Sequence, residues 1–186
     1  MANTTIEKYL EYLDSIFQVE PEFFTEESLD ENLPGVTSIV YRDIPEKGMI
    51  TALTYGVSLT EHKDWKSGRP ELCITVESDD ISWGQVVGYI GNHLRGKSSF
   101  AYGHTINFKE QISDDSGMDA FLIFGPSILG KEDYLGIDVG QDYKINLAGL
   151  YPIYSSEIEK FNKVGLEKFW HHPNFDLYNV NRKRIE

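Results

Sequence analysis

Residues 69–108 constrain the fold more than any other part of the chain, because this one segment contains two kinds of periodicity in succession. At residues 72–76 apolar side chains alternate with other types, which is the two-residue period of a half-buried β-strand. Further on, apolar side chains recur every three or four positions, as on one face of a helix: Trp83, Val86, Val87, Ile90 and Leu94. Gly96 follows, and a glycine can take the left-handed conformation that ends a helix. The segment predicts a strand, a helix and a second strand ending near Phe108.

The same patterns predict the other elements of the fold. Helices are predicted over 5–17 and 156–165, and strands over 36–44, 49–59, 118–124 and 145–153. Because strands dominate the middle of the chain and helices do not alternate with them regularly, the pattern favours an α+β fold. At 186 residues the chain has the size of one domain. We therefore predict a single domain, residues 1–186, with a central mixed, mostly antiparallel sheet and helices packed against one face.

The net charge of −13 limits the kind of partner that the chain can bind. An acidic surface repels nucleic acid, whose binding depends on Lys and Arg contacts to phosphates, but it would attract a basic protein. Residues 20–31 contain six acids and no base and are predicted to be irregular; they form either a partner-facing patch or a solvated loop. The basic run 182–184 either pairs with the acidic surface or is a disordered, solvated end. The alternative is that acidity serves solubility alone.

The cysteine content and the N-terminus predict a cytoplasmic protein. Cys73 is the single cysteine, so an internal disulfide is excluded, and its place in a predicted strand favours a packing role. The N-terminus has no basic start followed by an apolar core, so a secretory signal is not expected. No stretch approaches the roughly 18 apolar residues of a membrane span, so no membrane association is expected.

A search for catalytic motifs finds no phosphate-binding loop, no zinc-binding histidine pair and no nucleophile elbow. Gly84 and Gly88 lie within the predicted helix, where close helix packing explains them better than dinucleotide binding. The pairs Asp79-Asp80 and Asp114-Asp115 could serve a hydrolase, but carboxylates beside turns more often cap backbone N–H groups. We expect no catalytic residue, no metal site and no cofactor.

Several stretches of the chain resemble the suppressor-of-fused domain family over residues 35–183. They are residues 54–58 (TYGVS), 70–76 (PELCITV), 100–104 (FAYGH), 147–153 (LAGLYPI) and 173–183 (PNFDLYNVNRK). None of these motifs is diagnostic by itself, and their order and spacing carry the resemblance.

The resemblance implies a binding role. Animal members clasp an extended peptide of a transcription factor between two domains, whereas this chain has room for the first domain alone. Bacterial members look like immunity proteins that neutralise a cognate polymorphic toxin. The family's peptide site, carried over by position, implies partner-binding roles for Tyr89, Gly103 and His104, and we add Tyr102 of the same loop. The family has an acidic residue where this chain has His104, so peptide specificity need not be shared.

Three functions are therefore compared. The first is a non-enzymatic immunity protein that binds a basic toxin domain in the cytoplasm. The second is a regulatory adaptor that binds a cytoplasmic client peptide, for example as an added strand at a sheet edge. The third, less favoured, is a small hydrolase. Trp65, in a polar loop, is expected either to anchor a protein partner or to cover an edge of the sheet.

Overall fold

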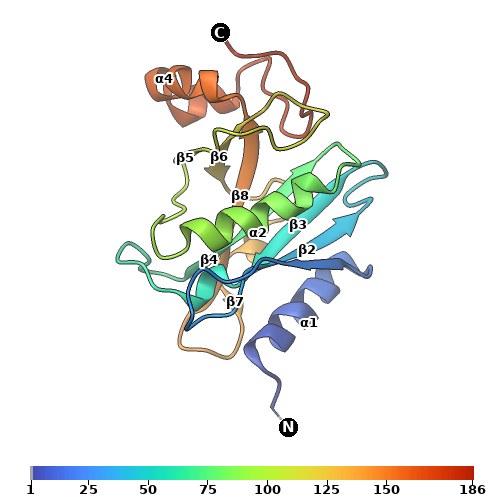
Figure 1. Cartoon of the computed structure of the whole chain (residues 1–186), viewed down its shortest axis with the longest axis vertical. Coiled ribbons are helices and arrows are strands. Elements are labelled where there is room, and N and C mark those ends of the chain that lie inside the picture. Colours follow the sequence, from blue (N-terminus) through green and yellow to red (C-terminus); the bar gives the residue numbers. More distant parts are fainter. Residues whose placement is uncertain (1) are drawn as a thin grey trace.

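The computed structural model describes residues 2–186 and is built on an eight-stranded sheet (Figure 1). The strands are β1 (Glu22–Thr25), β2 (Thr37–Arg42), β3 (Ile50–Tyr55), β4 (Arg69–Val76), β5 (Thr105–Asn107), β6 (Ala120–Phe124), β7 (Ile137–Asp138) and β8 (Lys144–Ile153). Their spatial order is β1-β2-β3-β4-β8-β6-β5, and β7 pairs with the start of β8. β4 and β8 run parallel, and the other pairs are antiparallel. The predicted α+β fold with a mixed, mostly antiparallel sheet is confirmed.

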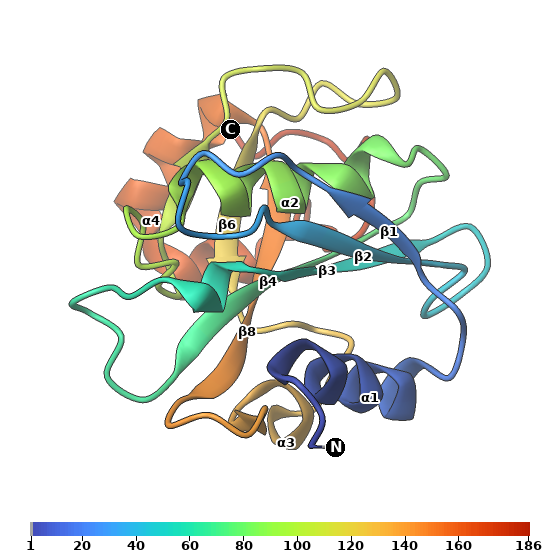
Figure 2. The ribbon, with the colours of Figure 1, turned by 60° about the horizontal axis from the view of Figure 1, so that its bottom comes forward.

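Helices cover both faces of the sheet (Figure 2). They are α1 (Thr5–Phe17), α2 (Ser82–Leu94), α3 (Lys131–Tyr134) and α4 (Ile158–Trp170), with 3₁₀ turns at Val57–Leu59 and Ser155–Glu157. α2 packs on one face, whereas α1 with α3 and, at the other end of β8, α4 pack on the opposite face. The prediction that helices cover one face was wrong. Strand β4 shows why: Leu72 and Ile74 face α2, but Cys73 between them is also buried, under α1, so the strand is not half-buried.

Helix α2 approaches the sheet closely through its glycines, as predicted. A Cβ atom added to Gly84 would lie 2.9 Å from both methyl groups of Val40, and one added to Gly88 would lie 2.4 Å from the hydroxyl oxygen of Ser38. Gly96 has a φ of 74°, so it ends the helix as expected. The N-cap residue Ile81 makes no side-chain cap, but the Asp80 carboxylate before it accepts a hydrogen bond from the first helical N–H, that of Ser82 (2.9 Å). The central segment is thus a packing unit.

A buried carboxylate in β4 fixes the end of β3. Glu71 accepts hydrogen bonds from the hydroxyl groups of Thr54 (2.6 Å) and Ser58 (2.7 Å) and from the N–H groups of Gly56 (2.9 Å) and Ser58 (3.0 Å). Gly56 has a φ of 130°, a conformation that side chains disfavour, and the chain turns there into a 3₁₀ helix. The strand predicted over 49–59 therefore ends at Tyr55. The stretches 54–58 and 70–76 form one structural feature.

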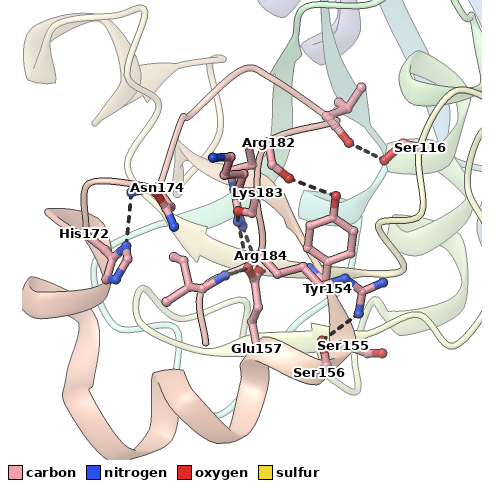
Figure 3. A network of polar contacts seen from close by, with 12 residues as sticks. Ser116, Tyr154, Ser155, Ser156, Glu157, His172, Asn174, Arg182, Lys183 and Arg184 are labelled. Carbon is pink, nitrogen blue, oxygen red and sulfur yellow. Dashed lines mark hydrogen bonds and ion pairs between the residues drawn. The ribbon is translucent and has the colours of Figure 1, made fainter.

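The C-terminal tail is packed against the fold, so the alternative of a disordered, solvated end was wrong, whereas the basic run does pair with an acid through Arg182 (Figure 3). Both guanidinium Nη atoms of Arg182 donate to the Glu157 carboxylate, at 2.7 and 2.8 Å, and both side chains are buried. The Ile185 N–H donates to the same carboxylate (2.8 Å). Glu157 also accepts from the Tyr154 N–H (3.0 Å), so the same carboxylate completes the cap at this helix start.

The acidic segment 20–31 is partly regular, contrary to the prediction of an irregular segment. Its residues Glu22–Thr25 form β1, which pairs antiparallel with β2 at one end of the sheet. The apolar side chain of Phe24 packs against the α2 side of the core, which fixes this strand in register. β1 and β5 are the two outermost strands, so each has one edge without a strand neighbour within residues 2–186.

Candidate partner-binding surface

The outer edge of β5 offers backbone groups for pairing with another chain. The Ile123 N–H donates to the His104 carbonyl oxygen (2.9 Å), and the Phe108 N–H donates to the Asp119 carbonyl oxygen (3.0 Å). In an antiparallel ladder, residues that bond to the neighbouring strand alternate with residues whose N–H and C=O point away. The backbone groups of Thr105 and Asn107 therefore point outward, along the free edge of the sheet.

The aromatic rings of Tyr89, His93 and Phe108 lie beside this edge. Tyr89 on α2 is 39% exposed, and its ring stacks on His93 with 4.0 Å between centroids. The same Tyr89 ring meets Phe108 edge to face at 5.7 Å. His104, Ile106 and Phe108 share one face of the strand by alternation, and Ile106 and Phe108 pack on the α2 side. Tyr89, His104 and Phe108 therefore flank the free edge of β5 on the same side of the sheet.

The loop before β5 holds the edge in place. Gly103 has a φ of 85°, and its N–H donates to the Ile123 carbonyl oxygen (2.8 Å). A Cβ atom at Gly103 would meet only Leu166 Cδ2 at 3.9 Å, so the glycine is required by its backbone conformation and not by space. His104 is exposed at the start of the edge. Gly103 thus acts by shaping the loop, while His104 is available for contact.

Trp65 and Tyr102 line a separate hollow of about 290 Å³ beside the start of β8. Phe100, Leu135 and Ala148 also line this hollow. The Trp65 Nε1–H donates to the Ser99 carbonyl oxygen (2.8 Å), so this half-buried side chain ties its loop to the loop before β5. The Tyr102 hydroxyl donates to the Leu147 carbonyl oxygen (2.8 Å).

Burial raises the pKa of the Tyr102 hydroxyl to about 12, so it remains a donor at neutral pH. Tyr102 is still 41% exposed. The hollow is apolar along much of its wall and could receive one side chain of a partner. Trp65 packs against the core on the α2 side and borders this hollow, and its role as a partner anchor stays a prediction.

The five predicted residues therefore fall into two neighbouring groups. Tyr89 and His104 border the β5 edge, Trp65 and Tyr102 line the hollow, and Gly103 lies in the loop between them. Sequence reasoning missed His93 and Phe108, which complete the aromatic group at the edge. The signal for His93 was present, because it follows Tyr89 by four residues on a predicted helix, where i and i+4 side chains meet.

One member of each acidic pair, Asp80 and Asp115, meets the other at the Ser113 hydroxyl and is held by hydrogen bonds from the surrounding turns. Asp115 accepts hydrogen bonds from the Ser78 hydroxyl (2.5 Å) and the Trp83 Nε1–H (3.2 Å), and Asp80 accepts from the hydroxyl of Ser113. Burial alone would raise the pKa of Asp80, but its hydrogen bonds from Ser113 and Ser82 together lower it. Both carboxylates therefore fix turns through their hydrogen bonds. Within residues 2–186 no cluster of three His, Cys, Asp or Glu side chains is placed to hold a metal ion.

A free sheet edge flanked by aromatic side chains is suited to binding a protein segment, because an added strand gains backbone hydrogen bonds while side-chain contacts give specificity. The comparison with family models identifies the family of the chain. The chain belongs to the suppressor of fused protein (SUFU) family, whose model matches residues 33–183. The resemblance predicted over residues 35–183 is confirmed, and the family is a non-catalytic, protein-binding one.

Solved structures agree on the fold. A suppressor of fused homolog from Neisseria gonorrhoeae is 17% identical, with a TM-score of 0.75 over 96% of this chain and 94% of that one. The Sufu–Fu complex structure contains a chain 11% identical, with a TM-score of 0.70 over 97% of this chain and 91% of that one. Drosophila Suppressor of Fused is 12% identical, with a TM-score of 0.66; it is matched over 96% of this chain but 50% of its own length. A search of curated protein sequences found no match. Among residues 2–186, none of the helices is long and apolar enough to span a membrane.

Proposed function

We propose that this protein binds an extended segment of a partner protein as an added strand along the outer edge of β5. The observation that carries the proposal is the free edge itself, where the backbone groups of Thr105 and Asn107 point outward. Tyr89, His104 and Phe108 supply the side-chain contacts beside it. Exposed aromatic rings in such a place are typical anchors of an interface, because they bury a large area at low entropic cost.

We infer further that the partner is a basic toxin domain, so that the protein acts as an immunity protein in the cytoplasm. The family resemblance to bacterial members supports this inference, and so does the net charge of −13. An acidic surface accelerates encounter with a basic partner, and this steering weakens as salt screens it. A regulatory adaptor would use the same edge of β5, and the nature of the partner separates the two functions.

The experiment is co-expression with the toxin domain encoded by a neighbouring gene. Restored growth of the host, together with co-purification of the two proteins, is the expected result for an immunity protein. If the neighbouring toxin domain kills with equal potency and is not captured, the immunity function is wrong. Capture of a non-toxic cytoplasmic client at the β5 edge would instead establish the adaptor.

Paired variants test whether the partner uses this edge. Tyr89→Ala is expected to weaken the complex about tenfold or more, as loss of an aromatic anchor does. Ile6→Ala is the matched control, because Ile6 on α1 has the same exposed fraction, 39%, on the other face. Thr105→Pro removes an outward-pointing N–H and should weaken the complex, whereas Thr105→Val should not. Equal affinity of all four variants would place the interface elsewhere.

A further inference from the structure

The outer edge of β1 has the same free backbone geometry as the edge of β5. The Glu26 N–H donates to the Val36 carbonyl oxygen (2.9 Å), which sets the alternation along β1. The hydroxyl groups of Thr25 and Thr37 lie 2.9 Å apart, as expected for a closely spaced pair between the ladder bonds. The N–H and C=O groups of Phe23 and Thr25 therefore point away from β2, into solvent.

An apolar hollow adjoins this edge. Phe23 is 54% exposed, and its side chain lines a hollow of about 430 Å³ between β1 and α1. Leu10 of α1 and Val19 and Pro21 of the connecting segment form its other apolar walls. Val19 is itself 42% exposed. A side chain of a bound strand that points toward α1 would enter this hollow and cover Phe23.

The charge around the edge has one sign. Residues 20–31 carry six acids without a Lys or Arg, and Asp14 of α1 borders the hollow. Glu22 is neutralised by Arg42, whose Nε lies 2.5 Å from its carboxylate. The other five acids form no ion pair within the described part of the chain. Their exposed charges favour a cationic occupant over a neutral or anionic one.

Protection against aggregation does not account for all of these features. Charged side chains on an edge strand do prevent edge-to-edge pairing, and they also disfavour a second copy of this chain, whose β1 would bring acids against acids. Protection alone, however, gives no reason for exposing Phe23 beside an open apolar hollow. An edge with free backbone groups, an apolar hollow and unpaired acids matches an extended strand that carries apolar and basic residues in alternation.

We propose that β1 and the hollow beside it form a second docking site, which accepts a Lys- and Arg-rich extended segment of a partner protein. The segment pairs with the outward backbone groups of Phe23 and Thr25. One of its apolar side chains fills the hollow against Val19, and its cations lie near Glu20 and Glu27. This site is independent of the β5 edge, so it stands whether or not the proposed toxin partner is correct.

The test uses a fluorescent nine-residue peptide in which lysine alternates with valine. Fluorescence anisotropy should show saturable binding at 50 mM NaCl that weakens about tenfold at 300 mM, because exposed charges are screened by salt. A peptide with glutamate in place of lysine should not bind. A lysine–valine peptide with an N-methyl group on every residue keeps the charge but can donate no backbone hydrogen bond from either edge, and it should bind at least fivefold more weakly.

Matched variants locate the peptide on the protein. Thr25→Pro removes an outward N–H without removing a backbone bond to β2 and should weaken binding at least fivefold. Thr25→Val loses the same hydroxyl contact with Thr37 but keeps the N–H, and it should leave binding unchanged. Thr105→Pro, at the other edge, should also leave it unchanged. Amide exchange of Phe23 and Thr25 in the wild-type protein should slow on binding, a readout that does not depend on any variant.

Three results would overturn the proposal. Equal binding of the N-methylated peptide would reduce the interaction to diffuse electrostatic attraction. Loss of binding in Thr105→Pro with retention in Thr25→Pro would assign the peptide to β5. A dimer of the free protein that is abolished by Thr25→Pro would show that a second copy occupies the edge of β1.

Discussion

Individual buried charges determine where distant parts of the chain meet. Glu157 at the start of α4 receives both Nη groups of Arg182 and two backbone N–H groups, so all sides of this carboxylate are satisfied. The Arg182 guanidinium also lies 5.0 Å from the ring centroid of Phe175, which packs under α4. A pair of this kind adds little when complete but costs much when one partner is removed, because the other charge stays buried.

Arg182→Met is therefore expected to lower the free energy of unfolding by about 3–5 kcal/mol. The neighbouring Lys183 is exposed, so Lys183→Met should change it by no more than about 0.5 kcal/mol. Urea denaturation followed by tryptophan fluorescence measures both variants. Similar, small changes in the two would show that the tail contributes through its total charge and not through the buried pair.

The sequence could not have identified this residue. Arg182, Lys183 and Arg184 look alike as a basic run, and their solvation depends on an acid 25 positions earlier in the chain. The local sequence pattern carries no information about a contact between residues so far apart in the chain. Cys73 is the opposite case, because a small residue within a strand pattern is expected to be buried, and its burial raises the pKa of the thiol to about 12. Such a thiol is not a nucleophile at neutral pH.

At the level of elements, α2 shows that a periodic sequence pattern can be sufficient to predict a helix and its ends. The stripe of apolar residues, the cap from Asp80 and the stop at Gly96 all agree with the structure, because each depends on residues close together in the chain. The two glycines also carried usable information, since a helix that retains Gly84 and Gly88 against their low helix propensity is one that packs closely. The number of helix layers was not predictable, because Cys73 and Thr75 can be buried or exposed in a strand.

Gly84→Ala is expected to destabilise the protein by about 1–3 kcal/mol, although alanine is ordinarily the better helix former, because its methyl group would overlap both methyl groups of Val40. Val40→Ala alone leaves a cavity in the core. In the double variant the new methyl group partly fills that cavity. The double variant should therefore lose about 1–2 kcal/mol less stability than the sum of the losses of the two single variants. A double-mutant cycle from urea unfolding measures this coupling. Simple additivity would show that α2 moves away from the sheet instead.

For the whole molecule, strand order is the property that local sequence leaves open. β4 and β8 pair in parallel at the centre of the sheet, with Cys73 opposite Gly149, and nothing in either strand specifies so distant a neighbour. The resemblance to a family gave a better guide than periodicity, because its motifs lie along the whole chain. Two of them, residues 54–58 and 70–76, proved to be halves of one buried hydrogen-bond network around Glu71.

This order predicts a gradient of local stability that bears on binding. Amides of β4 and β8 should exchange with solvent most slowly, near the rate set by global unfolding, because both strands have a neighbour on either side and are buried on both faces. The amides of Thr105 and Asn107 point outward, so they should exchange fastest among the amides of β6 and β5, the two strands that follow β8 in the spatial order of the sheet. Adding the partner should slow these two selectively, as added backbone hydrogen bonds protect them. Hydrogen exchange followed by NMR measures each residue. Uniform slowing across β4, β8 and β5 would instead indicate that the partner stabilises the fold as a whole and binds away from the β5 edge.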